Sequence, residues 1–308
     1  MTGRPTLVTG AAGFAGRHLI AHLNVSTPER PLLAWGRRQV DITDRDAVRN
    51  AVADARPDRI VHLAGAPHVG DSWRSSLLPL QTNVLGTHYL LEAVRQHCPD
   101  CRIVVVTSAM IYRTSDAAID EDAPLEPSSP YGLSKLAQDQ LALIAARNDG
   151  LNVVVARPFN HIGPYQNSSF ALSSFARQIA LIEAGLVPPE IHVGNLDAER
   201  DFTDVRDVAD AYARLLDAGQ PGRVYNICSD TPHRIADLLN RLIAIAHVPV
   251  TLATDPARLR PSDQPRMVGN SARIRTELGW RPQWSIDDTL TDLLQWWRGE
   301  VAAGRATA

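Results

Sequence analysis

Short apolar runs alternate with longer helical patterns through the first half of the chain. The runs at 6–9, 32–34, 59–63, 103–107 and 152–156 are almost continuously apolar, as in parallel strands covered on both faces. Helical patterns follow at 15–23, 45–55, 81–97 and 131–148. Strand and helix in this rhythm predict βαβ units, so we expect an α/β fold with a doubly wound parallel sheet of the Rossmann type.

The pattern changes after Pro158. Proline and glycine become frequent, and the expected elements are shorter: helices over 170–184, 204–217, 234–246 and 286–298, and strands over 190–193, 222–227 and 250–253. We therefore expect a dinucleotide-binding domain over 1–163, to which 201–231 returns. A smaller, interleaved C-terminal lobe would cover 164–200 and 232–308.

Charge and hydropathy exclude several classes of partner. A net charge of −3 gives no bulk attraction to nucleic acid or to an anionic membrane. No run of about 18 apolar residues occurs, so we expect no transmembrane helix. Residues 1–5 lack the apolar core of a secretory signal, and we expect a cytoplasmic protein.

The three cysteines argue against a disulfide framework. Cys98 and Cys101 form a CxxC, but a zinc site needs two further ligands at similar spacing, and we find none. A redox pair would start a helix after a strand, whereas this pair follows a helical pattern. We predict a chance pair in a connecting loop and no bound metal.

A glycine-rich turn follows the first strand directly. Gly10, Gly13 and Gly16 are spaced GxxGxxG, and a helix begins among them. Such glycines let the backbone approach a pyrophosphate, and the helix N-terminus offers it free N–H groups and a positive dipole end. The turn therefore predicts a dinucleotide site, with Phe14 and Ala15 at the start of the helix.

The end of the second strand indicates which dinucleotide. An acidic residue there would bind the 2′-hydroxyl of NAD, but the chain has Trp35, Gly36, Arg37 and Arg38. A guanidinium can hold a 2′-phosphate through two hydrogen bonds. We favour NADP(H), and NAD(H) stays possible if Arg37 and Arg38 are merely solvated.

Tyr131 and Lys135 stand four residues apart at the start of a predicted helix, so they share one face. A phenol has a pKa of about 10, and a nearby ammonium lowers that pKa. Tyr131 can then exchange a proton with a carbonyl or hydroxyl of the substrate. Lys135 is also the single lysine among 31 Lys and Arg residues, which indicates a position that arginine cannot fill.

Ser108 lies just past the fourth predicted strand, at the edge where open α/β sheets bind ligands. Its hydroxyl can hydrogen-bond the reacting oxygen. The expected catalytic residues are therefore Ser108, Tyr131 and Lys135. A serine that only caps a turn is the alternative.

These features resemble a known family. The glycine turn, Ser108, the Tyr131 and Lys135 pair, and Asp41 with Ile42 are similar to the extended short-chain dehydrogenase/reductases that act on nucleotide sugars. Several stretches resemble, more narrowly, the GDP-6-deoxy-D-mannose reductases: 69–73, 83–87, 157–164, 173–179, 193–196, 200–207 and 260–263. The resemblance covers nearly the whole chain, and it makes the smaller lobe the expected nucleotide-sugar site.

The resemblance implies further site residues. Along the cofactor it implies the loop 62–66 and, individually, Asp41, Ile42, Leu63, Ala64, Gly65, Asn83, Thr107, Tyr131, Lys135, Pro158, Asn160 and His161. Around the GDP-sugar it implies His68, Ser108, Asn160, Arg177, Val193, Asn195, Arg200, Arg260 and Asp263. Arginines suit a diphosphate and a carboxylate suits a ribose diol. For each arginine a surface ion pair is the alternative.

One departure from the family narrows the reaction. Related 4,6-dehydratases carry an acidic residue or pair just after the position of Ser108, where this chain has Ala109 and Met110. The resemblance therefore implies NAD(P)H-dependent reduction of a nucleotide-linked 6-deoxy-4-keto sugar, GDP-4-keto-6-deoxy-D-mannose to GDP-D-rhamnose. A nucleotide-sugar 4-epimerase, a reductase forming the C4-epimeric 6-deoxytalose, and a non-catalytic dinucleotide sensor stay open.

A homodimer is the expected assembly. The family pairs the helices corresponding to 81–97 and 131–148 across subunits. The second helix carries more apolar residues than one face against the sheet requires: Leu133, Leu136, Leu141, Leu143 and Ile144. Core packing within one subunit is the alternative.

Overall fold

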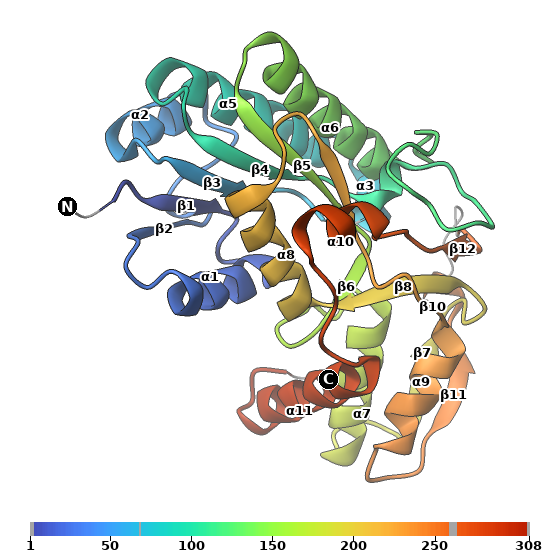
Figure 1. Cartoon of the computed structure of the whole chain (residues 1–308). Helices are drawn as coiled ribbons and strands as arrows, with labels where there is room; N and C mark the ends of the chain where they lie inside the picture. The colour runs from blue at the N-terminus through green and yellow to red at the C-terminus, as the bar shows by residue number, and fades with distance from the viewer. Residues whose placement is uncertain (1–2, 68, 259–263, 307–308) are drawn as a thin grey trace.

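The computed structural model describes residues 3–67, 69–258 and 264–306. Its main sheet has six strands in the order β2–β1–β3–β4–β5–β9, and every neighbouring pair is parallel (Figure 1). The strands are β1 (Thr6–Thr9), β2 (Leu32–Trp35), β3 (Arg59–His62), β4 (Arg102–Val106), β5 (Asn152–Pro158) and β9 (Val224–Ile227). The predicted α/β fold with a doubly wound parallel sheet is confirmed.

Helices cover both faces of this sheet. Alternate strand residues face opposite sides, so Leu7, Ile60 and Ile103 pack against α2 (Arg45–Ala55), α5 (Gly86–His97) and α6 (Pro130–Asn148). Val8, Val61 and Val104 pack against α1 (Phe14–Ser26) and α8 (Val205–Ala218). Burial on both faces explains why the strand sequences are apolar throughout.

The strand order reverses beside β1, because β2 and β3 lie on its two sides. Thr9 at the end of β1 is in register with His62 at the end of β3. The segments that follow both strands therefore leave the sheet at the same edge. Open α/β sheets bind their ligands in the crevice at such a point.

A smaller lobe lies below the sheet in Figure 1. Strand β8 (Glu199–Asp204) pairs with β6 (Asn160–Ile162), β10 (Pro232–Arg234) and β12 (Arg266–Met267), while β7 (Glu190–Val193) pairs with β11 (Thr251–Thr254). Three helices, α7 (Ala171–Glu183), α9 (Ile235–Ala244) and α11 (Ile286–Ala302), enclose a separate apolar core that includes Phe175, Leu239 and Leu294.

The chain passes between the two cores repeatedly. Helix α10 (Ala272–Leu278) lies against β9 and α8, and Ile274 and Trp280 join the core under α1 and α8. The indole of Trp280 also donates to the carbonyl of Asp207 at 3.0 Å. The lobe boundaries proposed from the sequence stay a prediction, to which this late return of the chain is added.

The structure differs from the sequence prediction at one important helix. The single helix expected over 81–97 is instead α4 (Leu77–Pro79), a π-helical turn η1 (Leu80–Leu85) and then α5. The remaining short elements were not predicted: helices α3 (Val69–Arg74) and α10, the 3-10 turns η2 (Ala109–Ile111) and η3 (Pro256–Arg258), and strands β6, β8, β10 and β12. π-Helical turns occur often at functional sites, and Asn83 lies within this one.

None of the helices in the described part of the chain combines the length and apolar character that a membrane-spanning segment requires.

Candidate active site

The glycine turn forms the first wall of the site. Gly10 has a positive φ of +68°, and a Cβ there would lie 2.7 Å from the backbone nitrogen of Ala64. No side chain caps helix α1 at Gly13, and Phe14 and Ala15 open its first turn. An uncapped helix N-terminus behind a tight glycine turn fits the pyrophosphate of a dinucleotide.

The loop after β3, which holds Leu63, Ala64 and Gly65, forms the second wall. Asn83 Oδ1 in η1 accepts the Ala66 N–H at 2.8 Å. A Cβ on Gly65 would lie 2.9 Å from Asn83 Oδ1 and 3.5 Å from Lys135 Nζ. The structure therefore brings Gly65, Asn83 and Lys135 together at the edge of the sheet, and their contact with the cofactor stays a prediction.

The arginines after β2 lie on the surface of the turn. The Arg37 side chain is 80% exposed and donates to Asp41 Oδ2 at 3.4 Å, and Arg38 is also exposed. Asp41 accepts hydrogen bonds from the N–H and hydroxyl of Thr43, which lower the pKa of its carboxyl. Ile42 is buried, and its side chain would meet a Cβ on Gly86 at 2.9 Å.

Helix α6 positions Tyr131 through three contacts at its start. Ser129 caps the helix by accepting the Gly132 N–H, and Pro130 occupies the first turn. Ser72 of α3 accepts the Tyr131 N–H at 3.2 Å. A Cβ on Gly132 would lie 2.6 Å from the carbonyl oxygen of Met110, so glycine allows α6 to press against η2.

The structure shows one of the two roles that the sequence left open for Ser108. Its hydroxyl caps η2 by accepting the Met110 N–H at 3.1 Å, and it lies close enough to the Tyr131 phenol to lower the pKa of that phenol. A hydrogen bond from Ser108 to the reacting oxygen stays a prediction. Ser108, Tyr131 and Lys135 are 7%, 8% and 6% exposed. The three predicted catalytic side chains therefore meet at the carboxyl end of β4, largely screened from water.

Burial moves the pKa values of both proton-handling groups. It raises the pKa of Tyr131 to about 12, opposed by the hydrogen bond to Ser108. It lowers the pKa of Lys135 to about 7, opposed by the charge of Asp139. A phenol that stays protonated at neutral pH can act as a proton donor. The Tyr131 pKa is therefore raised, not lowered as the sequence led us to expect, because burial of the phenol outweighs every other effect on it. Stabilisation of the phenolate by Lys135 stays a prediction.

A buried ion pair supports this helix from behind. Arg157 on β5 donates to Asp139 on α6 from Nε at 2.9 Å and from Nη2 at 2.7 Å. Thr107 donates to the same carboxylate at 3.1 Å. Arg157 is 2% exposed and Asp139 fully buried, so this pair fixes α6 against the sheet.

The chain leaves β5 through Pro158 and enters β6 at Asn160. The ring of His161 is stacked on Phe14, with centroids 5.7 Å apart and planes at 2°. His161 Nδ1 donates to the carbonyl of Phe159, while burial lowers the pKa of the imidazole. Asn160 and His161 thus adjoin the glycine turn and begin the smaller lobe.

The predicted sugar-nucleotide residues are spread over that lobe. Arg177 on α7 and Arg200 on β8 are half-buried, and Asn195 is exposed and accepts the Asp197 N–H. Val193 is 3% exposed and belongs to the core of the lobe, so only its backbone could face a ligand. His68, Arg260 and Asp263 lie outside the described residues.

Sequence reasoning did not connect several polar residues behind the site, although His62 lies in the loop 62–66 expected along the cofactor and Thr87 in the noted stretch 83–87. Thr87 and Gln138 are fully buried beside Lys135, and His62 and Thr9 continue the group toward the glycine turn. No spacing signal links them, because they come from four separate elements. Ser72 was likewise missed as an individual residue, although its stretch was noted.

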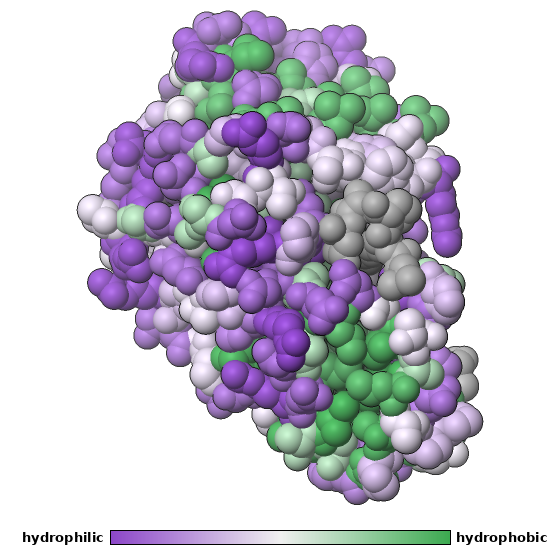
Figure 2. All heavy atoms as spheres, turned by 90° about the vertical axis from the view of Figure 1, so that its right-hand side faces the viewer, coloured by the Kyte–Doolittle hydropathy of each residue, from purple (hydrophilic) through white to green (hydrophobic). Residues whose placement is uncertain are grey.

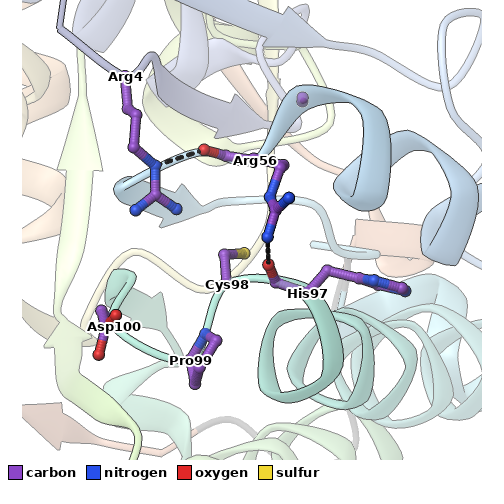
Figure 3. Close-up of a pocket in the computed structure, with 7 residues that line it drawn as sticks. Arg4, Arg56, His97, Cys98, Pro99 and Asp100 are labelled. Carbon is purple, nitrogen blue, oxygen red and sulfur yellow. Dashed lines mark hydrogen bonds between the residues drawn. The ribbon is translucent and has the colours of Figure 1, made fainter.

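The cysteine pair lies in a connecting loop, as predicted. Cys98 ends α5 and Cys101 precedes β4, and both are buried free thiols. Figure 3 shows Cys98 beside Arg4 and Arg56. These residues line a pocket of about 370 Å³ at the amino edge of the sheet, because Arg4, Arg56 and Asp100 precede β1, β3 and β4. Within the described ranges, no group of three or more His, Cys, Asp or Glu side chains is arranged to hold a metal.

Comparison with known proteins supports the geometry. A GDP-6-deoxy-D-mannose reductase of Pseudomonas aeruginosa is 39% identical over 297 residues, which cover 96% of this chain and 97% of the relative. The solved structure of RMD from Pseudomonas aeruginosa complexed with NADPH has 36% identity and a TM-score of 0.88, covering 97% of this chain and 100% of the other.

A more distant structure shares the fold and carries the other dinucleotide. It is a UDP-glucose 4-epimerase of Thermus thermophilus in complex with NAD, with 25% identity, a TM-score of 0.84, and coverage of 96% of this chain and 99% of the other. The family model for GDP-mannose 4,6 dehydratase matches residues 37–293. The chain therefore belongs to the GDP-mannose 4,6-dehydratase family of extended short-chain dehydrogenase/reductases.

Proposed function

We propose that this NAD(P)-dependent oxidoreductase reduces the 4-keto group of GDP-4-keto-6-deoxy-D-mannose and forms GDP-D-rhamnose. The observation that carries the proposal is the meeting of Ser108, Tyr131 and Lys135 beside an uncapped glycine turn. The substrate rests on likeness to a GDP-6-deoxy-D-mannose reductase over almost the full length of both chains.

The residues divide the chemistry among them. The nicotinamide, when bound, supplies the hydride that reduces C4. Ser108 hydrogen-bonds the carbonyl oxygen of the sugar and polarises it. Tyr131 donates the proton to that oxygen, and the positive charge of Lys135 stabilises the phenolate that results. Gly65 and Asn83 line the same wall as Lys135, which lets Lys135 also hold the nicotinamide ribose.

Reduction is favoured over dehydration. Elimination of water requires an acid or base next to the position of Ser108, and the two following residues are Ala109 and Met110. Neither side chain can transfer a proton. The chain thus carries the redox groups of its family without a carboxylate at these two positions.

NADPH is the favoured reductant. Arg37 and Arg38 are exposed where the 2′-phosphate of NADPH would lie, and RMD of Pseudomonas aeruginosa was solved with NADPH. NADH stays possible, because other relatives of the same fold carry NAD.

The test is incubation of the purified protein with GDP-4-keto-6-deoxy-D-mannose and either NADPH or NADH, followed by identification of the product sugar. We expect oxidation of one cofactor equivalent per sugar and GDP-D-rhamnose as product. GDP-6-deoxytalose would reverse the proposed stereochemistry, and absence of net oxidation would overturn the reductase. Tyr131→Phe should lose turnover and keep cofactor binding, whereas a non-catalytic sensor would be indifferent.

We also propose a cytoplasmic homodimer. Apolar side chains stand exposed on the helices that the family pairs: Leu85 is 44%, Leu133 55% and Ile144 44% exposed. Leu77 and Leu78 of α4 are 61% and 49% exposed. Figure 2 shows apolar residues near the top of the molecule, at the height of α5 and α6, and a second group on the smaller lobe. Burial of this α4–α6 surface against a second copy would remove it from water.

A further inference from the structure

A series of hydrogen-bonded, buried polar side chains lies behind Lys135, and the proposed mechanism does not use it. Gln138, Thr87 and His62 are fully buried, and Thr9 is 1% exposed. They come from α6, α5, β3 and β1, and each lies within hydrogen-bond distance of the next. A buried polar group without a hydrogen-bond partner lowers the stability of the fold, so we expect every group in this series to have one. The donors and acceptors along the series can therefore be assigned in turn.

The hydrogen-bonded series begins at the ammonium of Lys135. Its Nζ donates to the Val106 carbonyl at 3.0 Å and to Gln138 Oε1 at 2.8 Å. An ammonium has three donors and no acceptor, so Gln138 must present its amide oxygen and not its nitrogen. These two bonds leave the third N–H of Lys135 for a ligand.

The other members of the series hold the Gln138 amide in one orientation. Gln138 Nε2 donates to Thr87 Oγ1 at 2.8 Å, and Thr87 commits its own proton to the Asn83 carbonyl at 2.7 Å. Thr87 therefore has only lone pairs to offer His62, whose Nε2 lies 2.9 Å away and must be the protonated nitrogen.

The series ends at Thr9, next to the glycine turn. Because His62 carries its proton on Nε2, its Nδ1 accepts from the Thr9 hydroxyl at 2.7 Å. Thr9 Oγ1 in turn accepts the Ala64 N–H at 3.2 Å. Burial lowers the pKa of His62 to about 3, so the imidazole is neutral, as this pattern requires. Each of these groups has its partners in a single assignment.

We propose that Gln138 is a positioning residue for Lys135, held by Thr87, His62 and Thr9 so that its amide oxygen fixes the place and direction of the ammonium. The inference rests on the proposed function, because it concerns the group that serves Tyr131. It ties the lysine to β1 and β3, the strands whose ends form the dinucleotide site. The amide of Gln138 hydrogen-bonds Lys135 and Thr87, so Gln138 acts on the site through the lysine.

An amide suits this task better than a carboxylate. A carboxylate at 2.8 Å would pair with the ammonium and hold its charge toward itself. A neutral oxygen orients Lys135 and leaves its charge for the phenolate of Tyr131. The titratable groups coupled to Lys135 through charge are Asp139 on its own helix and His62 on β3.

The single lysine makes the proposal directly measurable. Carbon-13 at the ε-position of lysine gives one side-chain signal, whose shift with pH reports the protonation of Lys135 in the intact protein. We expect Gln138→Glu to raise the pH at the midpoint of the Lys135 titration by about one pH unit or more, and Gln138→Met to lower that midpoint. We also expect Gln138→Met to reduce kcat by at least about tenfold with little change in KM for the sugar.

Two further variants separate positioning from general support of the fold. Thr87→Val removes the anchor of Gln138 and should shift the midpoint in the same direction as Gln138→Met. Gln178→Met removes another buried amide, which bonds His192 and Ser174 in the smaller lobe. We expect it to lower the thermal midpoint and leave the titration of Lys135 unchanged.

The result that overturns the proposal is a Lys135 midpoint that is the same in wild type, Gln138→Glu and Gln138→Met. A variant that does not fold is replaced in the comparison by Thr87→Val. The proposed function fails differently: the wild type would not oxidise NADPH with the keto sugar, while the lysine signal would still respond to Gln138.

Discussion

Lys135 holds a positive charge where water hardly reaches it. Its ammonium has two protein acceptors, Val106 and Gln138, and the nearest opposite charge belongs to Asp139, which is already engaged by Arg157. A buried charge costs free energy that the hydrogen bonds only partly return. The site therefore trades some stability of the fold for a cation beside Tyr131.

We expect Lys135→Met to stabilise the protein more at about pH 6 than at about pH 10. Burial lowers the pKa of Lys135 from 10.5 to about 7. Between these values the unfolded chain binds more protons, so the free energy of unfolding of the wild type rises with pH across this window. The variant lacks this dependence. Urea unfolding of the wild type and the variant at both pH values tests this prediction. The same difference in the free energy of unfolding at about pH 6 and at about pH 10 would contradict it.

The Asp139 and Arg157 pair makes a second prediction. Asp139→Asn leaves the Arg157 charge buried without its partner, which costs about 3–5 kcal/mol of the free energy of unfolding. The matched control is Asp210→Asn, because Asp210 pairs with Arg214 on α8 at 2.7 Å where both side chains are in part exposed, at 28% and 46%. We expect the control to cost less than about 1 kcal/mol. Similar unfolding midpoints in urea for the two variants would contradict the prediction.

Single helices and turns decide how closely the catalytic groups approach. Helix α6 can press its first turn against η2 only because residue 132 has no Cβ, and Ser129 and Ser72 fix the backbone on both sides. The π-helical turn η1 serves the same end, since it holds Asn83 at the loop after β3. The glycine in α6 and the π-helical turn η1 thus set the positions of Tyr131 and Asn83.

We expect Gly132→Ala to lower kcat by at least about tenfold, because the new methyl must move the start of α6, and Tyr131 with it. The Cβ would lie 2.6 Å from the Met110 carbonyl. Gly299→Ala in α11 is the control, since nothing lies within 4 Å of its Cβ. It should raise stability by roughly 0.5–1 kcal/mol and leave kcat unchanged. Equal kcat values for the two variants would show that α6 has room at Gly132.

The sequence predicts the regular elements well and the irregular ones poorly. Helix α2 has the bounds expected from its pattern, because Asp44 caps it and its apolar face repeats regularly. Strand β8 was missed because polar residues face inward along it. Asp201 is fully buried and accepts N–H groups from Ser229, Asp230 and Gly269, which are distant in sequence.

The meeting of Ser108, Tyr131 and Lys135, which we propose as catalytic, and the glycine turn could be predicted for a related reason. Their residues lie close in sequence to strand ends, so local spacing carries the signal. The group behind Lys135 could not be, because Thr9, His62, Thr87 and Gln138 meet only after the sheet has formed. Nor does spacing indicate η1, the π-helical turn in which Asn83 accepts the Ala66 N–H.

At the scale of the whole molecule, the exposed apolar side chains predict assembly. We expect the wild type to sediment as a dimer and Leu133→Glu to sediment as a monomer, because the new carboxylate would be buried in the proposed interface. Leu133 is 55% exposed, and Leu186 on the smaller lobe is similarly exposed at 54%. Leu186→Glu is therefore the control and should stay dimeric. A monomeric wild type, or a dimeric Leu133→Glu, would contradict the prediction.

The repeated passage of the chain between the two cores also limits how such a protein can change. The chain leaves the sheet at β6, returns at α8, leaves again at β10 and returns at α10. One crossover between two related genes would therefore exchange pieces of both lobes and break packed contacts in each. A new sugar preference cannot arrive as a transplanted module. It has to accumulate as scattered single substitutions, on a cofactor site that stays in place throughout.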